Sequence, residues 1–316
     1  MNLFLDQYTK INHIENNHYL FDSRQDFSQI RHKIYSYTVI KNNEFSRLKF
    51  YIKNKNKIKS CFCFGNIPPP LNLNVKTLVY FQNLNILHSN SFKEKIKRKY
   101  IAFLLKSRYV FIFQTSYSCI SFKKSVSKKE LNFKVFPFFN TIKGENKNKR
   151  QENSYFYPAA KTKNKNHKLL ISSFKLFAKK IKIPVVLYLT ITDEEFLNCQ
   201  EGEATDAPLN LKIINLGSID FRKVIEKYNE VQYLIFPSIE ESFGLPLIEA
   251  TLNGCKVISS DLPFTHEVIK PSLVFNPTEK SSLVKKLIES LEYTEIEKTT
   301  LIVQNKLSNL IEAIIL

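Results

Sequence analysis

Glycine is scarce in this sequence and unevenly distributed. The 316 residues contain six glycines, and all of them lie at or after Gly65. The first 64 residues therefore lack a glycine-rich loop of the kind that approaches a phosphate closely. Long apolar runs are also missing: none approaches the roughly 20 residues that span a bilayer, and the N-terminus is too polar for a secretion signal. Tryptophan is absent, but 43% of the residues are hydrophobic, which excludes a disordered chain.

Cysteine is also rare, and its few positions are scattered. An odd number of cysteines, most of them in apolar runs, favours reduced thiols buried as small hydrophobes in a cytosolic protein. The Cys61-x-Cys63 pair lies in an expected strand and lacks the ligand spacing of a zinc site. The five cysteines are Cys61, Cys63, Cys119, Cys199 and Cys255.

Acidic residues are scarce in the first half of the chain. The net charge is +18, but residues 1–150 contain 28 Lys and Arg against 8 Asp and Glu, while residues 151–316 contain 19 against 21. This asymmetry predicts an anionic partner for the first half, either nucleic acid or the anionic inner leaflet of a membrane. AT-rich codon usage is the alternative, but it does not explain the balanced second half. Because no recognised nucleic-acid-binding motif occurs, we expect no nucleic acid partner.

One basic segment could contact such a membrane directly. Residues 92–108 predict a helix that combines apolar residues with five basic residues between Lys93 and Lys99. A basic amphipathic helix can lie on a membrane surface, although such helices more often pack their apolar stripe on a sheet. Both interpretations stay open at this level. The apolar residues are Ile96, Tyr100, Ile101, Phe103, Leu104 and Leu105.

The length of the chain predicts two domains. Residues 143–154 are polar and charged without apolar periodicity, which is typical of a linker. We therefore expect a basic domain over residues 1–150 and a second domain over 151–316, whose tail, residues 292–316, is helical by pattern and crosses back to the first domain. Alternation of apolar runs with helical patterns predicts parallel sheets. A helix is expected over residues 1–20, and strands over 19–21, 60–64, 75–81, 109–113, 136–140, 184–190 and 211–216.

The second domain is organised around residues 231–260. This segment opens with an apolar run that predicts a buried strand. A loop with two glutamates and one glycine follows, then a helix with proline in its first turn, where a missing N–H is harmless. Strand, loop, helix and strand form a βαβ unit. The expected elements are a strand over Tyr233–Phe236, a helix over Pro246–Leu252 that stops at Gly254, and a strand over Val257–Ser260.

The loop and the first helical turn carry groups suited to an anionic ligand. A helix N-terminus presents free N–H groups and the positive end of its dipole to an anion, and Gly244 lets a phosphate approach the backbone. Glu249 can accept hydrogens from two neighbouring hydroxyls, as a ribose offers them, and Glu241 can reach a sugar beyond the phosphates. Acidic residues near the start of a helix are also common as ordinary caps, so this pattern alone is weak evidence for a ligand-binding site.

The segment FPSIEESFGLPLIEA resembles the signature of retaining GT-B glycosyltransferases of glycosyltransferase family 4, also called glycosyl transferases group 1. That family carries two glutamates separated by seven residues, as are Glu241 and Glu249, and Phe243, Gly244 and Leu245 match its context. The resemblance implies that Glu249 binds the donor ribose and that Glu241 contacts the donor sugar. It also assigns Phe243, Gly244 and Leu245 to the donor site.

Residues 155–174 are similar to the first strand, loop and helix of the donor domain in that family. This similarity implies that Lys165 neutralises the donor phosphates, a role that suits a point charge. The arginine that follows the strand in the family is absent, and Ala159 occupies its place. Gly217 and Ser218 end a strand that flanks the nucleotide base in the family.

The first domain matches the family less closely. A histidine that faces the donor sugar often follows the strand equivalent to residues 75–81, but here Gln82 occupies that place. We assign Gln82 and Asn83 to sugar or acceptor contact; a polar strand end without function is the alternative. The first strand and glycine-rich loop of the family have no counterpart here, which we expect to reflect a truncated N-terminus or an internal start.

The predicted fold is α/β of the GT-B type, with two doubly wound Rossmann-like domains facing a central cleft. The expected activity is transfer of a sugar, with retention, from a nucleotide-diphosphate sugar to a lipid-linked glycan during synthesis of a bacterial surface polysaccharide such as O-antigen or capsule. No D-x-D metal motif occurs, so we expect a metal-independent transferase without a cofactor, in which Lys165 and the helix end stabilise the leaving diphosphate. We expect a cytoplasmic protein, peripheral on the inner face of the cytoplasmic membrane.

Two other interpretations use the same fold. A catalytically degenerate GT-B protein could bind a nucleotide sugar, a membrane or a partner, because the glycine loop and the donor-domain arginine are missing. A nucleotide-sugar 2-epimerase also has this fold, but the context of the two glutamates argues against it.

Overall fold

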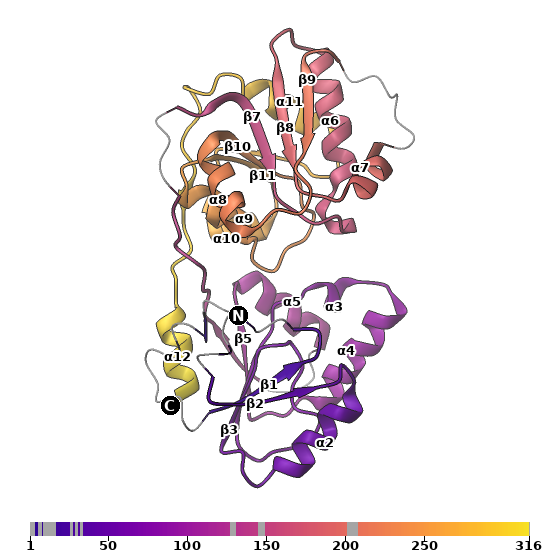
Figure 1. Ribbon diagram of the computed structural model, residues 1–316, viewed down its shortest axis with the longest axis vertical. Helices are drawn as coiled ribbons and strands as arrows, with labels where there is room; N and C mark the ends of the chain where they lie inside the picture. Colours follow the sequence, from indigo (N-terminus) through magenta and orange to yellow (C-terminus); the bar gives the residue numbers. More distant parts are fainter. Residues whose placement is uncertain are drawn as a thin grey trace. The chain divides into compact units, whose positions relative to one another are not determined.

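The computed structural model divides the chain into two compact units, which are described separately. Unit 1 comprises residues 1–139 and 304–316, and unit 2 comprises residues 140–303. Figure 1 colours the chain along its sequence, so the C-terminal helix of unit 1 is yellow. The division falls before the boundary expected near residue 150. The structure describes residues 4, 5, 8, 17–25, 28, 31, 34–126, 131–144, 149–200 and 208–315; most of the helix expected within residues 1–20 lies outside them.

Unit 1 contains a four-stranded parallel sheet in the order β3-β4-β5-β6 and a separate parallel pair, β1-β2. The strands are β1 (His18–Asp22), β2 (Ser36–Ile40), β3 (Ser60–Cys63), β4 (Lys76–Tyr80), β5 (Tyr109–Phe113) and β6 (Asn132–Val135). The described helices are α2 (Glu44–Asn54), α3 (Asn85–His88), α4 (Phe92–Leu104), α5 (Ser116–Val126) and α12 (Leu307–Ile315).

The central strands β4 and β5 of the unit 1 sheet are buried on both faces, which is why they are nearly continuous apolar runs, whereas the edge strand β6 is partly exposed. Successive residues of β4 point to opposite faces. Leu78 and Tyr80 pack in one cluster with Leu310 of α12. Val79 packs in the other cluster with Phe122 of α5. Helix α12, from the far end of the chain, therefore completes the core of unit 1.

Unit 2 contains a six-stranded parallel sheet in the order β13-β11-β10-β7-β8-β9. Helices cover both faces of this sheet (Figure 1). The strands are β7 (Gln151–Tyr157), β8 (Val185–Leu189), β9 (Leu211–Asn215), β10 (Val231–Phe236), β11 (Lys256–Ser260) and β13 (Leu273–Phe275), and an antiparallel pair joins β12 (Ile269–Lys270) to β14 (Thr300–Leu301). The helices are η3 (Lys163–Lys165, a 3-10 turn), α6 (His167–Lys179), α7 (Asp193–Gln200), α8 (Phe221–Glu230), α9 (Leu245–Leu252), α10 (Pro263–Val268) and α11 (Lys280–Glu289).

Aromatic residues fill the core of unit 2 on both sides of β7. Tyr155 contacts Phe174 of α6 edge-on, with ring centroids 5.1 Å apart. Phe156 points the other way and contacts Tyr228 of α8 at 5.5 Å. Such edge-to-face pairs favour one packing arrangement over a generic apolar core. The central strands are therefore held rigidly, and the loops at their carboxyl ends have a fixed base.

Three sequence-based expectations are wrong at the ends of elements. Residues 151–154 belong to β7 rather than to a linker, since the backbone N–H of Asn153 donates to Gln232 Oε1 at 2.7 Å. Residues 136–140 form no strand; β6 ends at Val135, and Pro137 has no N–H to donate to a ladder. The C-terminal 25 residues are not one helix, because β14 precedes α12.

Candidate functional site

The start of helix α9 is set by a glycine and a proline. Gly244 has φ +77°, and a Cβ placed there would lie 3.0 Å from Leu247 Cδ1. This left-handed conformation strongly favours glycine. Pro246 occupies the first turn, and the N–H of Leu247 already donates to Gly244 O at 2.9 Å. Two positions of this first turn, Pro246 and Leu247, therefore have no N–H to offer a ligand, and a side-chain cation beside this helix end would add positive charge.

Lys165 supplies that charge. Its Nζ forms an ion pair with Glu241 Oε1 and lies 5.6 Å from the centroid of the Phe236 ring. The side chains of Lys165 and Glu241 are only 20% and 13% exposed. Lys165 follows β7 and Glu241 follows β10, and neighbouring parallel strands end at the same edge of a sheet. A cation and a carboxylate thus face each other where ligands bind in sheets of this type.

Backbone contacts hold the two loops that carry this pair. The Asn164 Nδ2 donates to Glu240 O at 3.0 Å, and the N–H of Ile239 donates to Asn164 O at 2.8 Å. The hydroxyl of Tyr157, at the end of β7, donates to Lys165 O at 2.9 Å. The ion pair therefore sits on a preorganised scaffold rather than on two independent loops.

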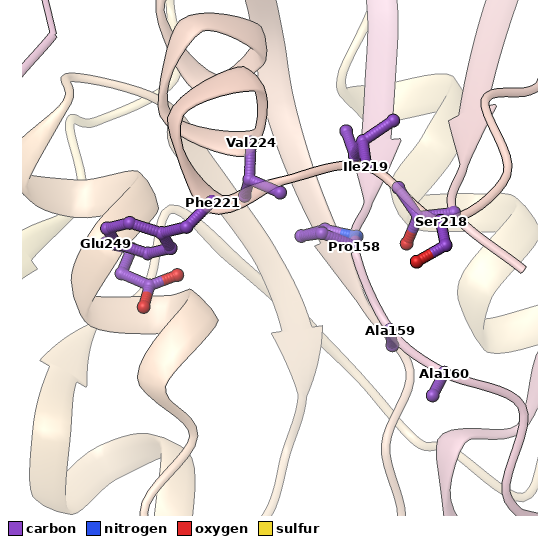
Figure 2. Close-up of a pocket in the computed structure, with 9 residues that line it drawn as sticks. Pro158, Ala159, Ala160, Ser218, Ile219, Phe221, Val224 and Glu249 are labelled. Carbon is purple, nitrogen blue, oxygen red and sulfur yellow. The ribbon is translucent and has the colours of Figure 1, made fainter. Parts of the chain in front are cut away.

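A cavity of about 300 Å³ lies at the carboxyl ends of β7, β8 and β9. Figure 2 shows the Glu249 carboxylate and the Ser218 hydroxyl on its walls, with residues 158–160 between them. Phe221 contributes an aromatic ring to the lining, and most of the other walls are apolar, as expected of a small-molecule site. The lining residues are Pro158, Ala159, Ala160, Thr190, Ser218, Ile219, Phe221, Val224 and Glu249.

Burial raises the pKa of Glu249 to about 7. The Tyr228 hydroxyl donates to Glu249 Oε2 at 3.4 Å and lowers that pKa in part. Tyr228 is itself fully buried, and burial raises its own pKa well above the ordinary value. Arg150 fixes the surrounding backbone by donating to Val231 O at 2.6 Å and to Asn253 O. A carboxyl that titrates near neutral pH is typical of functional sites.

The structure brings part of the expected donor site together. Glu249 and Ser218 line one cavity, and Gly217 precedes Ser218 with φ +65°. The Phe243 side chain is buried, whereas the Leu245 side chain is largely exposed.

Gln82 and Asn83 lie in unit 1, directly after β4. The side-chain Nε2 of Gln82 donates to Phe64 O at 3.0 Å, and the backbone N–H of Gln82 donates to Asn66 Oδ1 at 2.7 Å. Asn83 Oδ1 accepts from the N–H of Asn85 at 3.1 Å. Both side chains therefore have roles in shaping the strand end, whatever else they contact.

Sequence reasoning missed several residues of the site. Thr190 and Ile219 could have been found, because they follow β8 and β9 at the edge where ligands bind. Tyr228 and Arg150 carried no such signal, since each acts through contacts with residues distant in sequence. Ala159, which replaces the arginine of the resembled family, lies in the cavity wall.

The comparisons with known proteins agree with this architecture. The sequence model of the glycosyl transferases group 1 family matches residues 138–306, more than half of the chain. The chain is 27% identical over 243 residues to the O-antigen chain mannosyltransferase RfbU of Salmonella typhimurium, covering 74% of this chain and 65% of that protein. It spans less than two thirds of the length of the curated relatives it matches, down to 18%.

Solved structures confirm the predicted fold. A glycosyltransferase from Rickettsia africae superposes with a TM-score of 0.66 at 17% identity, covering 99% of this chain and 89% of that one. Anabaena HepE, in its complex with UDP-glucose, superposes with a TM-score of 0.66 at 14% identity, covering 87% and 82%. The fold is GT-B, and the chain belongs to the glycosyl transferases group 1 family.

Proposed function

We propose that this protein transfers a sugar, with retention, from a nucleotide-diphosphate sugar to a hydroxyl of a lipid-linked glycan. The observation that carries the proposal is the grouping of Lys165, Glu241 and Glu249 at the carboxyl edge of the unit 2 sheet. The carboxylate of Glu249 suits the ribose of a nucleotide-diphosphate sugar, the cation of Lys165 suits its diphosphate, and the carboxylate of Glu241 suits its sugar.

The cavity suits the nucleoside part of the donor. Its volume and apolar walls fit a base, and Phe221 offers a ring against which a base can stack. The Glu249 carboxylate on the wall can accept both hydrogens of a ribose diol. Gly217 and Ser218 then lie beside the base and ribose, as the family resemblance implies.

Lys165 and Glu241 suit the reacting end of the donor. When the bond between the sugar and the diphosphate breaks, negative charge grows on the leaving phosphate, and a preorganised cation stabilises that charge. Lys165, which forms an ion pair with Glu241 in the loop ahead of α9, suits this role. Donor binding would draw Lys165 to the pyrophosphate and free Glu241 to accept hydrogens from the sugar hydroxyls. In this scheme the charge on the diphosphate is met by Lys165, and transfer proceeds without a metal.

The curated relatives and the positive charge of the first half of the chain support the proposed class of acceptor. RfbU is named as an O-antigen chain mannosyltransferase, which supports a role in synthesis of a bacterial surface polysaccharide such as O-antigen or capsule. The strongly basic first half supports an acceptor held at an anionic membrane. No helix in the described part of the chain is long and apolar enough to cross a bilayer. We therefore propose a peripheral enzyme on the inner face of the cytoplasmic membrane.

The test is donor turnover. Purified protein would be screened with UDP-, GDP- and ADP-sugars for thermal stabilisation, and the donor that binds would be assayed for release of its nucleotide in the presence of a lipid-linked glycan acceptor, with and without EDTA. A ligand whose free concentration is about one hundred times its dissociation constant raises the free energy of unfolding of the protein by about 2.7 kcal/mol. Glu241→Ala should keep donor binding and lower turnover by about 100-fold or more. Glu292→Gln, a change at an exposed acid of unit 2, is the matched control.

Three outcomes separate the alternatives. Turnover that is lost in Glu241→Ala and kept in Glu292→Gln supports a transferase. Donor binding without turnover in the wild type would identify a catalytically degenerate binding protein. Absence of stabilisation by every nucleotide sugar would refute the proposed donor site.

A further inference from the structure

Helix α4 has two apolar faces, and only one of them is covered. Ile101 and Leu104 are buried, and Ile101 packs in the core cluster that includes Val79 and Phe111 of the unit 1 sheet. Phe92, Ile96 and Phe103 are 79%, 51% and 76% exposed. These three residues lie four and eleven positions apart, which places them within about 40° of one another around the helix. One apolar face of the helix thus packs in unit 1, as one of the two interpretations of the sequence expected, and a second apolar face is left exposed.

Lysines share this exposed face. Lys93, Lys95 and Lys99 are the other exposed residues between Phe92 and Phe103. The acid of this stretch, Glu94, is turned inward and pairs with Lys97 at 2.7 Å. The exposed side of α4 thus presents apolar rings among positive charges.

Helix α2 carries a second face of the same kind beside the first. Phe45 and Ile52, seven positions apart, are 77% and 62% exposed, and Lys49 and Lys53 between and beside them are exposed as well. Figure 1 shows α2 and α4 as neighbours in unit 1.

A hydrogen bond ties the two helices together. The Tyr100 hydroxyl of α4 donates to Glu44 Oε2 of α2 at 2.8 Å. Phe45 adjoins Glu44, and Phe103 lies about one turn from Tyr100, so this bond joins the two helices close to one exposed ring of each. We define the docking face as Phe45, Ile52, Phe92, Ile96 and Phe103 with the exposed lysines of α2 and α4 among them.

The charge around the docking face is almost entirely positive. Residues 41–108 contain 15 Lys and Arg and only two acidic residues, Glu44 and Glu94. Both acids are already paired, Glu44 with Arg47 at 3.1 Å and Glu94 with Lys97. A group of exposed aromatic and aliphatic side chains can mark an interaction surface, and a partner for this one must tolerate a high density of positive charge.

We propose that the docking face binds an anionic lipid bilayer. The aromatic and aliphatic side chains would enter the boundary between headgroups and acyl chains, while the lysines meet the lipid phosphates, as in helices that lie in the plane of a membrane. A second copy of this chain fits poorly, because two such faces would set lysines against lysines. The inference deepens the proposed function by naming the surface that reaches its lipid-linked acceptor, and it uses no residue of the donor site.

The experiment is cosedimentation of the full chain with vesicles. Vesicles of phosphatidylglycerol and phosphatidylcholine should bind the protein at least about tenfold more tightly than vesicles of phosphatidylcholine alone, and added salt should weaken the binding. Phe45→Ser/Phe92→Ser/Phe103→Ser should lower the affinity about tenfold or more. Lys95→Glu/Lys99→Glu should do the same. All of these side chains are exposed, so folding should persist.

Matched controls come from exposed positions of unit 2. Leu197→Ser/Ile302→Ser and Lys285→Glu/Lys298→Glu change the same types of side chain elsewhere and should leave vesicle binding intact. Equal binding to neutral and anionic vesicles, or full binding by the serine variant, would overturn the proposal. So would a wild-type dimer in sedimentation velocity that the serine variant converts to monomer.

Donor binding, followed by thermal stabilisation with nucleotide sugars, is measured on the same samples. If vesicles bind but nucleotide sugars do not, the docking face is supported and the proposed function fails. If nucleotide sugars bind but anionic vesicles do not, the docking face alone is refuted.

Discussion

Donor binding should depend on pH through Glu249. Burial raises the pKa of this carboxyl to about 7, so the unliganded protein holds it about half ionised at pH 7. Only the ionised form can accept both hydrogens of a ribose diol. If donor binds that form alone, the affinity should fall about tenfold between pH 8 and pH 6, in proportion to the ionised fraction.

Isothermal titration calorimetry with an intact nucleotide-diphosphate sugar would measure this effect, because its pyrophosphate has no ionisation near neutral pH. Titrations in buffers with different ionisation enthalpies should show about half a proton released per donor bound at pH 7. Tyr228→Phe should move the profile to higher pH, since the hydroxyl that favours the ionised form is lost. Glu249→Gln should bind more weakly, with a flat profile. A flat wild-type profile, or an unchanged slope in Glu249→Gln, would refute the reasoning.

The same carboxyl should destabilise the empty protein above neutral pH. A carboxyl whose pKa is higher in the folded state binds protons more tightly there. Its contribution to stability is therefore complete below the unfolded pKa, near 4.5, and is lost as pH rises through about 7. The shift corresponds to about 3 kcal/mol. Urea unfolding should find unliganded Glu249→Gln more stable than wild type at pH 8 by up to that amount, with a difference below about 1 kcal/mol at pH 5.

Three further substitutions test the scaffold of the site. Lys165→Ala should slow transfer by about 100-fold or more; an unchanged kcat in steady-state kinetics would remove Lys165 from the mechanism. Gly244→Ala should lower the free energy of unfolding by about 1–2 kcal/mol in urea, whereas Gly65→Ala, where an added Cβ meets nothing within 4 Å, should have little effect. Arg150→Ala leaves the carbonyls that Arg150 binds without a donor and should lower the free energy of unfolding by about 3 kcal/mol. Lys149 has a side chain that is 87% exposed, so Lys149→Ala should leave that free energy unchanged.

Most strands could be predicted from the sequence because buried parallel strands are continuous apolar runs. The run at 184–190 became β8, Val185–Leu189, and the run at 211–216 became β9, Leu211–Asn215. The βαβ unit around α9 was predicted to within two residues, since proline and glycine mark its helix at both ends. The expected strand at 19–21 is also present, as part of β1.

The errors arise where pairing with distant residues overrides local composition. Gln151–Ser154 is polar and predicts a linker, yet its backbone joins the sheet beside β8 and β10. The aromatic run at 136–140 predicts a strand, but its residues pack as loop against the core, with Phe138 and Phe139 buried.

In the candidate site, too, some residues could be predicted from a local sequence motif and others only from tertiary packing. The positions of Glu241 and Glu249 follow from a local motif. Tyr228, which tunes Glu249, lies 21 residues away in sequence and is placed beside it by packing alone.

Helix α12 has a consequence for how the molecule is made. Because Leu310 and Ile311 close a core whose strands lie roughly 200 or more positions earlier in the chain, a ribosome must finish all of unit 2 before unit 1 can complete its interior. Until then Leu78, Tyr80 and Ile112 lack the apolar side chains of α12 that pack against them. Nascent chains should therefore expose an apolar face of the unit 1 sheet, which chaperones can bind. Removing the final segment should therefore weaken the half of the protein that was translated first.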